Sequence, residues 1–205
     1  SLASRRRRAV RSWRSRRGGT TRSVPSSTGY AMIVDQRRYS SQELLRDGGS
    51  IHIRALRPDD KRRLSAHFQQ LSARSIYFRF LGAKKLLTDA ELARFTELDF
   101  ESRVGLVATL GRGEEEKIIG VGRYVVLTTE PGARHSAELA FAVLDEHQGR
   151  GIGTVLLEHL LGIAGQQGIR EFEADVMGEN QAMLGVFRSS GLLVRGTLDS
   201  GVVHL

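Results

Sequence analysis

The sequence contains no cysteine and only three prolines among its 205 residues. The absence of cysteine excludes a disulfide scaffold, a thiolate metal site and a cysteine nucleophile. No run of apolar residues approaches the length that crosses a bilayer, which excludes a transmembrane protein. Apolar residues make up 40% of the chain and charged residues 26%. These fractions are typical of a soluble globular protein, and we predict a cytoplasmic location.

Positive charge is unevenly distributed along the chain. The formal net charge is +8, and residues 1–29 hold nine arginines and no acidic residue. The other 22 basic and 23 acidic residues almost balance. The positive excess therefore belongs to the N-terminal segment alone.

Residues 1–41 are predicted to be a basic, disordered tail and linker, because no helical or strand period there would bury apolar side chains. A tail rich in arginine and free of acids is compatible with a transit peptide, or with electrostatic binding to nucleic acid or an anionic membrane. Arginine outnumbers lysine 27 to 4 in the whole chain, so we favour a simple compositional bias. We therefore expect no membrane partner, and no nucleic-acid partner except through this tail.

Residues 42–205 are predicted to form one domain of strands and helices. The expected strands are 51–55, 103–110, 117–128, 136–144 and 169–176. The expected helices begin at Pro58, after Ser72 and after Thr88, and cover 151–168 and 180–190. A final hairpin is expected from 192–197 and 201–205. This order indicates an α/β (α+β) fold with a mixed, mostly antiparallel, twisted sheet flanked by helices.

A glycine-rich turn joins the strand at 136–144 to the following helix. Its glycines allow close approach of a ligand, and the helix start presents unpaired N–H groups and a positive dipole end, which suits a phosphate. A dinucleotide fingerprint is excluded because Thr154 or Leu156 stands where the third glycine belongs, and the Gly-Lys-Ser/Thr of a Walker loop is absent. The turn alone is equally compatible with a connection that binds nothing.

The strand that leads into this turn carries one acidic residue, Glu138, among apolar neighbours. An acid in this place is a candidate general base. A lysine amine has a pKa of about 10.4 and must lose a proton before it can attack an acyl group. Taken alone, however, the pattern favours a glutamate that points into solvent.

Several features in the same order resemble the GNAT superfamily of N-acetyltransferases. They are the strand end Phe141–Leu144, the pattern Gln148-x-x-Gly151-x-Gly153, and downstream Asn180, Phe187 and Gly191-Leu192. The resemblance covers 42–205. It implies a GNAT-like domain over this range, with acetyl-CoA as co-substrate.

Four segments are more narrowly similar to the GNAT module of bacterial protein lysine acetyltransferases. They are IRALRPDD (53–60), LSARSIYFRFLG (71–82), LTDAELARFTELDF (87–100) and AELAFAVLDEHQGRGIGTVLL (137–157). This resemblance implies acetyl transfer to a protein lysine. The expected partners are then acetyl-CoA and a protein substrate.

The resemblance also implies the roles of the site residues. Glu138 is the general base, and we expect burial among its apolar neighbours to raise its pKa. Backbone amides near Val143 and Leu144 contact the oxyanion and the pantetheine arm. The pyrophosphate is held by Gln148, Gly149, Arg150, Gly151, Ile152, Gly153 and Thr154, and the pantetheine is flanked by Asn180 and Phe187.

The expected mechanism is direct attack in a ternary complex. Without cysteine, an acetyl-cysteine intermediate is excluded. Phe187 stands where many relatives have a tyrosine acid and cannot donate a proton, but a thiol of pKa about 8.5 leaves readily as thiolate. No His-Glu-x-x-His pattern occurs, and we expect no metal.

Three other functions stay open at this point. The first is the same chemistry on a small amine, which differs only in the acceptor. The second is a non-catalytic acyl-CoA-binding regulatory module, which Phe187 slightly favours and Glu138 disfavours. The third is a nucleic-acid-binding protein that uses the arginine-rich tail.

Overall fold

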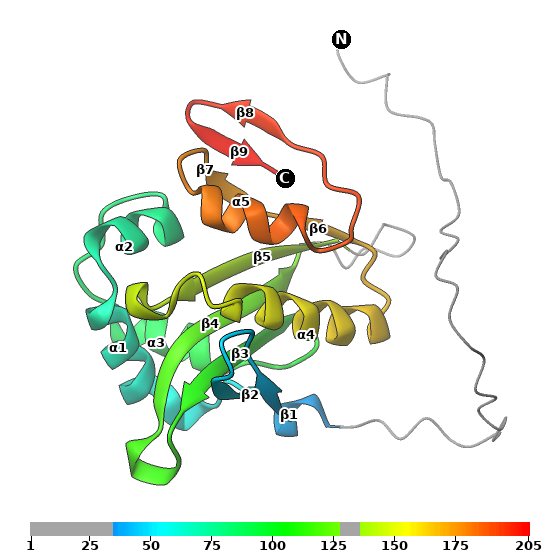
Figure 1. Cartoon of the computed structure of the whole chain (residues 1–205). Coiled ribbons are helices and arrows are strands. Elements are labelled where there is room, and N and C mark those ends of the chain that lie inside the picture. The colour runs from blue at the N-terminus through cyan, green and yellow to red at the C-terminus, as the bar shows by residue number, and fades with distance from the viewer. Residues whose placement is uncertain (1–34, 128–135) are drawn as a thin grey trace, which may run out of the picture. The chain divides into compact units, whose positions relative to one another are not determined.

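The computed structural model describes residues 35–127 and 136–205, and the predictions about the tail up to residue 34 lie outside this range. Six strands form one sheet in the order β1-β2-β3-β4-β5-β6 (Figure 1). All neighbours are antiparallel except β5 and β6, which are parallel. The predicted mixed, mostly antiparallel sheet is confirmed. Its strands are β1 (Ser40–Leu44), β2 (Ser50–Ala55), β3 (Arg103–Leu110), β4 (Lys117–Val126), β5 (Ser136–Val143) and β6 (Glu171–Glu173).

Helices cover both faces of this sheet. Along β4, Gly120 and Gly122 face α4, whereas Val121 and Arg123 line a cavity together with α1 to α3. A Cβ on Gly120 would lie 3.0 Å from Ile152 Cγ2, so glycine here lets α4 pack close to the strands. No helix in the described ranges is long and apolar enough to cross a membrane. The helices are α1 (Lys61–Gln70), α2 (Ala73–Phe80), α3 (Asp89–Thr96), α4 (Ile152–Gln166) and α5 (Gln181–Arg188).

The single strand predicted at 169–176 is divided between two sheets. β6 pairs with β5, but the chain then continues as β7 (Asp175–Met177), which pairs with β9 in a second sheet of three strands. Between them, the Ala174 carbonyl accepts a hydrogen bond from the Leu205 N–H at 2.9 Å, which directs the segment away from β5. The predicted final hairpin is present as β8 (Thr197–Asp199) and β9 (Val202–His204), with a first strand that begins later than expected.

β1 is a strand that the sequence pattern does not predict. None of its side chains is buried, so the period of a half-buried strand is absent. It is an edge strand held by backbone pairing with β2, from Ser40 opposite Arg54 to Leu44 opposite Ser50. β1 lies across the predicted start of the domain at residue 42, and the division into tail and domain remains a prediction.

A buried arginine fastens the start of α1 to the sheet. Arg54 of β2 is 1% exposed, and its guanidinium donates two hydrogen bonds to Asp60 (2.6 and 2.8 Å) and two to Glu116 (2.9 and 2.7 Å). Burial alone would lower the pKa of Arg54, but the two carboxylates outweigh burial and raise it. The same bonds lower the pKa of Glu116. Because Asp60 precedes α1 and Glu116 precedes β4, this network sets α1 against the sheet.

Replacing Arg54 with leucine removes the four hydrogen bonds to Asp60 and Glu116 and leaves the two carboxylates only the longer ion pairs with Arg63, at 3.6 and 3.8 Å. We expect Arg54→Leu to reduce the free energy of unfolding by about 3–5 kcal/mol at neutral pH, as measured by urea denaturation. Folding lowers the pKa of Glu116, so its contribution is present above the ordinary glutamate pKa of about 4.3 and is lost as the pH falls. The difference between wild type and variant should therefore shrink below about pH 4.

Lys61→Gln is the control for this prediction. Lys61 at the start of α1 forms an ion pair with Glu97 after α3, but both side chains of this pair are exposed. The substitution should cost less than about 1 kcal/mol. An equal cost for the two substitutions, or a difference that does not change with pH, would show that the Arg54 network does not stabilise the fold as described.

Candidate active site

β5 is paired on one side along nearly its whole length and on the other side only at its start. It pairs with β4 over 137–143, but with β6 only over 136–138. The next strand along the chain, β7, belongs to the second sheet (Figure 1). From residue 139 onward, β5 therefore has an open edge, where an extended ligand can pair like an added strand.

The hydrogen-bond alternation of β5 determines which amides reach this open edge. The Leu144 N–H donates to the Ile119 carbonyl of β4 at 2.9 Å. In an antiparallel ladder every second residue then faces β4, and the residues between, Phe141 and Val143, point their N–H groups to the open edge. Of the two predicted amides, the N–H of Val143 is available to a ligand, whereas the N–H of Leu144 is hydrogen-bonded to β4.

The start of α4 presents a run of free amides. Within the described residues, the N–H groups of 149–154 have no hydrogen-bond partner, and the first with one is Val155, which donates to the Gly151 carbonyl at 3.0 Å. Gly149 and Gly151 have φ of +73° and +90°, which glycine adopts without strain. No atom lies within 4 Å of the position where a Cβ of either would be. These amides, at the positive end of a 15-residue helix, fit a diphosphate.

Gln148, also predicted to bind the pyrophosphate, is bonded within the protein instead. Its Nε2 donates to the Val143 carbonyl at 3.0 Å and to the Ser75 hydroxyl at 3.1 Å, and its N–H donates to the Asp145 carbonyl at 3.2 Å. Asp145 in turn accepts from the Ser72 N–H and from both serine hydroxyls. Burial would raise the pKa of Asp145, but these bonds outweigh it and lower that pKa. Gln148 and Asp145 thus hold the glycine turn in place.

Three further predicted ligand residues also have contacts within the protein. The Arg150 guanidinium pairs with Asp47 in the β1–β2 turn at 2.5 Å. Asn180 caps the start of α5 through its side-chain oxygen. Phe187 is 7% exposed and its ring packs edge-on against Phe141, with centroids 6.1 Å apart. Phe187 is therefore a core residue behind the strand edge.

Glu138 is exposed, so the prediction that it is buried is wrong. Side chains alternate along a strand, and Ala137 and Leu139 take the buried positions. Glu138 shares its face with Ala142, which lines the cavity under α1 to α3. Its register partner Glu173 is the last residue before β5 and β6 separate. The acid thus stands where the open edge begins, on the sheet face opposite α4.

The sequence analysis assigns no site role to Phe141, Arg79 or Arg123. The free amide of Phe141 follows from the two-residue period of the strand, counted back from Val143. Arg123 is the one charged residue inside the apolar run 118–126, and this is the same pattern that marks Glu138 in β5. Arg79 carries no sequence signal, because its place in the cavity depends on how α2 packs.

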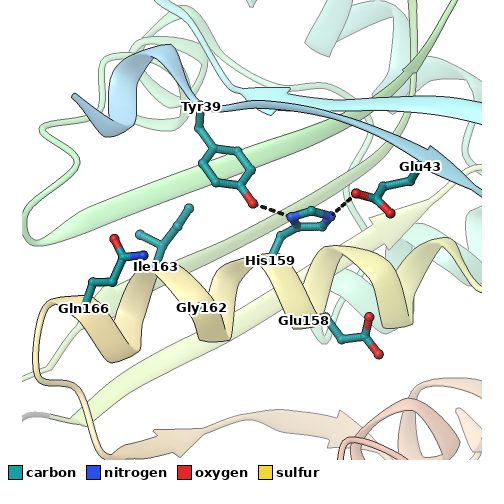
Figure 2. Close-up of a pocket in the computed structure, with 7 residues that line it drawn as sticks. All are labelled: Tyr39, Glu43, Glu158, His159, Gly162, Ile163 and Gln166. Carbon is teal, nitrogen blue, oxygen red and sulfur yellow. Dashed lines mark hydrogen bonds and ion pairs between the residues drawn. The ribbon is translucent and has the colours of Figure 1, made fainter. Parts of the chain in front are cut away.

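A second cavity, of about 310 Å³, lies between β1 and α4 (Figure 2) and is larger than the one under α1 to α3. There the Tyr39 hydroxyl is hydrogen-bonded to Nδ1 of His159, and Nε2 of His159 lies 3.1 Å from Glu43. Burial, together with Glu43, raises the pKa of Tyr39 and keeps the phenol protonated. The hydroxyl then donates to Nδ1, and Nε2–H donates to Glu43. This cluster fastens β1 to α4, and none of the predicted site residues lines it.

The arrangement around β5 and α4 defines a class of protein. Transfer of an acyl group from coenzyme A requires three parts. They are amides that bind a diphosphate, a strand edge that pairs with an extended arm, and a carboxylate nearby. In the part of the chain that the structure describes, no group of three or more histidine and acidic side chains is placed to hold a metal ion.

Comparison with known proteins leads from this class to a family. The acetyltransferase (GNAT) family matches residues 72–192, more than half of the chain, and the chain belongs to this family. It is an acetyltransferase, and acetyl-CoA is the co-substrate of this family. The family, enzyme class and co-substrate expected from the sequence are confirmed.

Similar proteins include bacterial acetyltransferases. An acetyltransferase of Pseudomonas aeruginosa is 31% identical over 141 residues, which are 69% of this chain and 74% of that protein. The acetyltransferase Pat of Mycolicibacterium smegmatis is 32% identical over 160 residues, 78% of this chain but 46% of Pat, so the chain spans about half of that relative. The crystal structure of the GNAT domain of S. lividans PAT has a TM-score of 0.73 and 37% identity, covering 80% of this chain and 94% of that domain.

An isosteric pair of substitutions at Gly151 tests the diphosphate site. Both asparagine and aspartate tolerate a positive φ better than other side chains, but only aspartate adds a negative charge beside the free amides. We expect Gly151→Asp to weaken coenzyme A binding at least about tenfold more than Gly151→Asn, as measured by calorimetry. Equal affinities for the two variants would show that no phosphate binds next to this residue.

Proposed function

We propose that the protein transfers the acetyl group of acetyl-CoA to a lysine side chain of a protein, by direct attack in a ternary complex with Glu138 as general base. One observation carries the proposal: Glu138 stands where β5 and β6 separate, at the start of the open edge. The similarity to Pat and to the GNAT domain of S. lividans PAT supports a protein acceptor.

The backbone positions the thioester. The free amides of 149–154 hold the diphosphate, and the open edge of β5 pairs with the pantetheine arm as a strand would. The N–H of Phe141 donates to the thioester carbonyl oxygen, where negative charge develops during attack. The packing of Phe187 against Phe141 supports this amide from behind.

Glu138 prepares the acceptor. A lysine amine has a pKa of about 10.4, so its ammonium form must give up a proton before attack. Glu138 accepts this proton, directly or through a water molecule, and releases it to solvent, to which it is exposed. The amine nitrogen bonds to the carbonyl carbon, the carbon–sulfur bond breaks, and the nitrogen loses its second proton to solvent. Coenzyme A leaves as the thiolate of a thiol of pKa about 8.5, which needs no protein acid. The phenyl group of Phe187 is compatible with this step.

Substituting Glu138 tests the base. We expect Glu138→Gln to lower kcat by at least about 10²-fold, with little change in the KM for acetyl-CoA, in an assay with a lysine peptide. The deficit should narrow as the pH approaches about 10, because the free amine then no longer needs a base.

Glu158→Gln is the matched control, since Glu158 lies on α4 at the larger cavity in Figure 2. It should leave kcat within about twofold of wild type, as a change remote from the reacting atoms. Wild-type turnover by Glu138→Gln at pH 8 would remove Glu138 from its role. Transfer to small amines but to no lysine peptide would replace the protein acceptor with a small one.

A further inference from the structure

Two arginines on the Glu138 face of the sheet have no acidic partner. Arg79 of α2 and Arg123 of β4 line a cavity of about 40 Å³ under α1 to α3, together with Ala142 of β5. Both are half-buried, and among the described residues neither forms an ion pair or a hydrogen bond. The Nε of Arg123 is fully buried with no partner. A buried donor left unpaired costs stability, so its retention calls for an explanation.

The guanidinium groups are oriented by aromatic rings. Arg123 Cζ lies 4.4 Å from the centroid of Phe95, and Arg79 Cζ lies 5.0 Å from that of Phe80. Contact with a ring occupies the flat face of a guanidinium and leaves the N–H groups at its rim free. These rims are what a carboxylate binds, through paired hydrogen bonds.

The charges in this region do not balance. Burial, helped by the charges of Arg123 and Arg94, lowers the pKa of Arg79 to about 9, and Glu138 opposes this shift. Burial and Arg94 likewise lower the pKa of Arg123, again against Glu138. Within the described residues, the positive charges of Arg79, Arg123 and Arg94 are therefore opposed by one carboxylate, Glu138. A further anion would relieve their repulsion.

Arg54 on the same face of the sheet provides a comparison, because its charge is fully paired within the protein. Arg54 is buried with two carboxylates and four hydrogen bonds to them. Arg79 and Arg123 have no such partners, and the cavity beside them holds no protein carboxylate. The other orphaned atom there, Nε2 of His67, is an acceptor, because Nδ1 lies 3.0 Å from the Ile118 carbonyl and donates to it. His67 therefore needs a donor such as water and takes no part in binding an anion.

We propose that Arg79 and Arg123 bind a carboxylate of the acceptor, and that in a protein acceptor this is an aspartate or glutamate beside the acetylated lysine. This inference rests on the proposed function. The acceptor is favoured over the acyl donor because the arginines share the face of Glu138, which receives the acceptor's proton, while the diphosphate site begins α4 on the opposite face. The cavity has room for one carboxylate but not for a long chain.

The experiment compares matched lysine peptides, with aspartate and glutamate or with asparagine and glutamine on either side of the lysine. We expect wild type to acetylate the acidic peptide with a kcat/KM about tenfold higher at low salt. Arg79→Gln and Arg123→Gln should each bring this ratio toward one, with the KM for acetyl-CoA unchanged. Arg74→Gln is the control, because Arg74 is an exposed arginine of the same helix, and it should keep the wild-type ratio.

A charge reversal guards against loss of folding. Arg79→Glu should prefer a peptide with arginine beside the lysine over the acidic peptide, which no unfolded or merely weakened enzyme would do. A wild-type ratio near one, or an equal loss for both peptides in the arginine variants, would overturn the inference. So would a preference for succinyl-CoA over acetyl-CoA that the same variants abolish, since this would assign the arginines to the donor.

Failure of the proposed function gives a different result. The enzyme could acetylate free amino acids but no lysine peptide, in a reaction that depends on Arg79 and Arg123. This result would reject a protein as the acceptor but would support the carboxylate site at the two arginines. Transfer to peptides of both kinds at equal rates leaves the proposed function in place and removes only the arginine site.

Discussion

The active site depends on a strand pairing that stops after three residues. β5 and β6 are hydrogen-bonded over 136–138, and the next strand then pairs in a different sheet. Had β6 continued along β5, the amides of Phe141 and Val143 would be used within the sheet, and no edge would remain for the pantetheine arm. After β6 the chain is instead hydrogen-bonded to the C-terminal segment, through Ala174 and Leu205 and the pairing of β7 with β9. The C-terminal strand β9 thus takes part in leaving the edge of β5 open.

Around this opening, hydrogen bonds hold the ligand-binding backbone in place before any ligand arrives. Gln148 links β5 to α2, and Asp145 fixes the start of α2 through Ser72 and Ser75. The free amides of 149–154 are therefore aimed in advance, so that binding orders little of the protein. Gln148, which the sequence predicts as a ligand residue, thus holds the neighbouring backbone in place.

We propose that the opposite face of the sheet receives the acceptor. There the fold places an exposed carboxylate, Glu138, next to guanidiniums that have no partner of their own, Arg79 and Arg123. The fully paired Arg54 on the same side shows that the fold can satisfy a buried arginine when it serves stability. This difference between the arginines is the basis of our proposal that Arg79 and Arg123 bind a substrate carboxylate.

The sequence by itself determined the family, the sheet with its helices and the glycine turn before α4, because periodicity and glycine spacing are local properties of the chain. It did not determine β1, whose residues become a strand only through β2, nor the division of 169–176 between two sheets. For Glu138, the local pattern alone favours exposure, whereas the resemblance predicts burial. The sequence did not determine that the Leu144 amide is used within the sheet, or that Arg79 and Arg123 meet. Those outcomes depend on which strand lies beside β5 and how α2 packs, and such contacts between distant segments exist only in the tertiary structure.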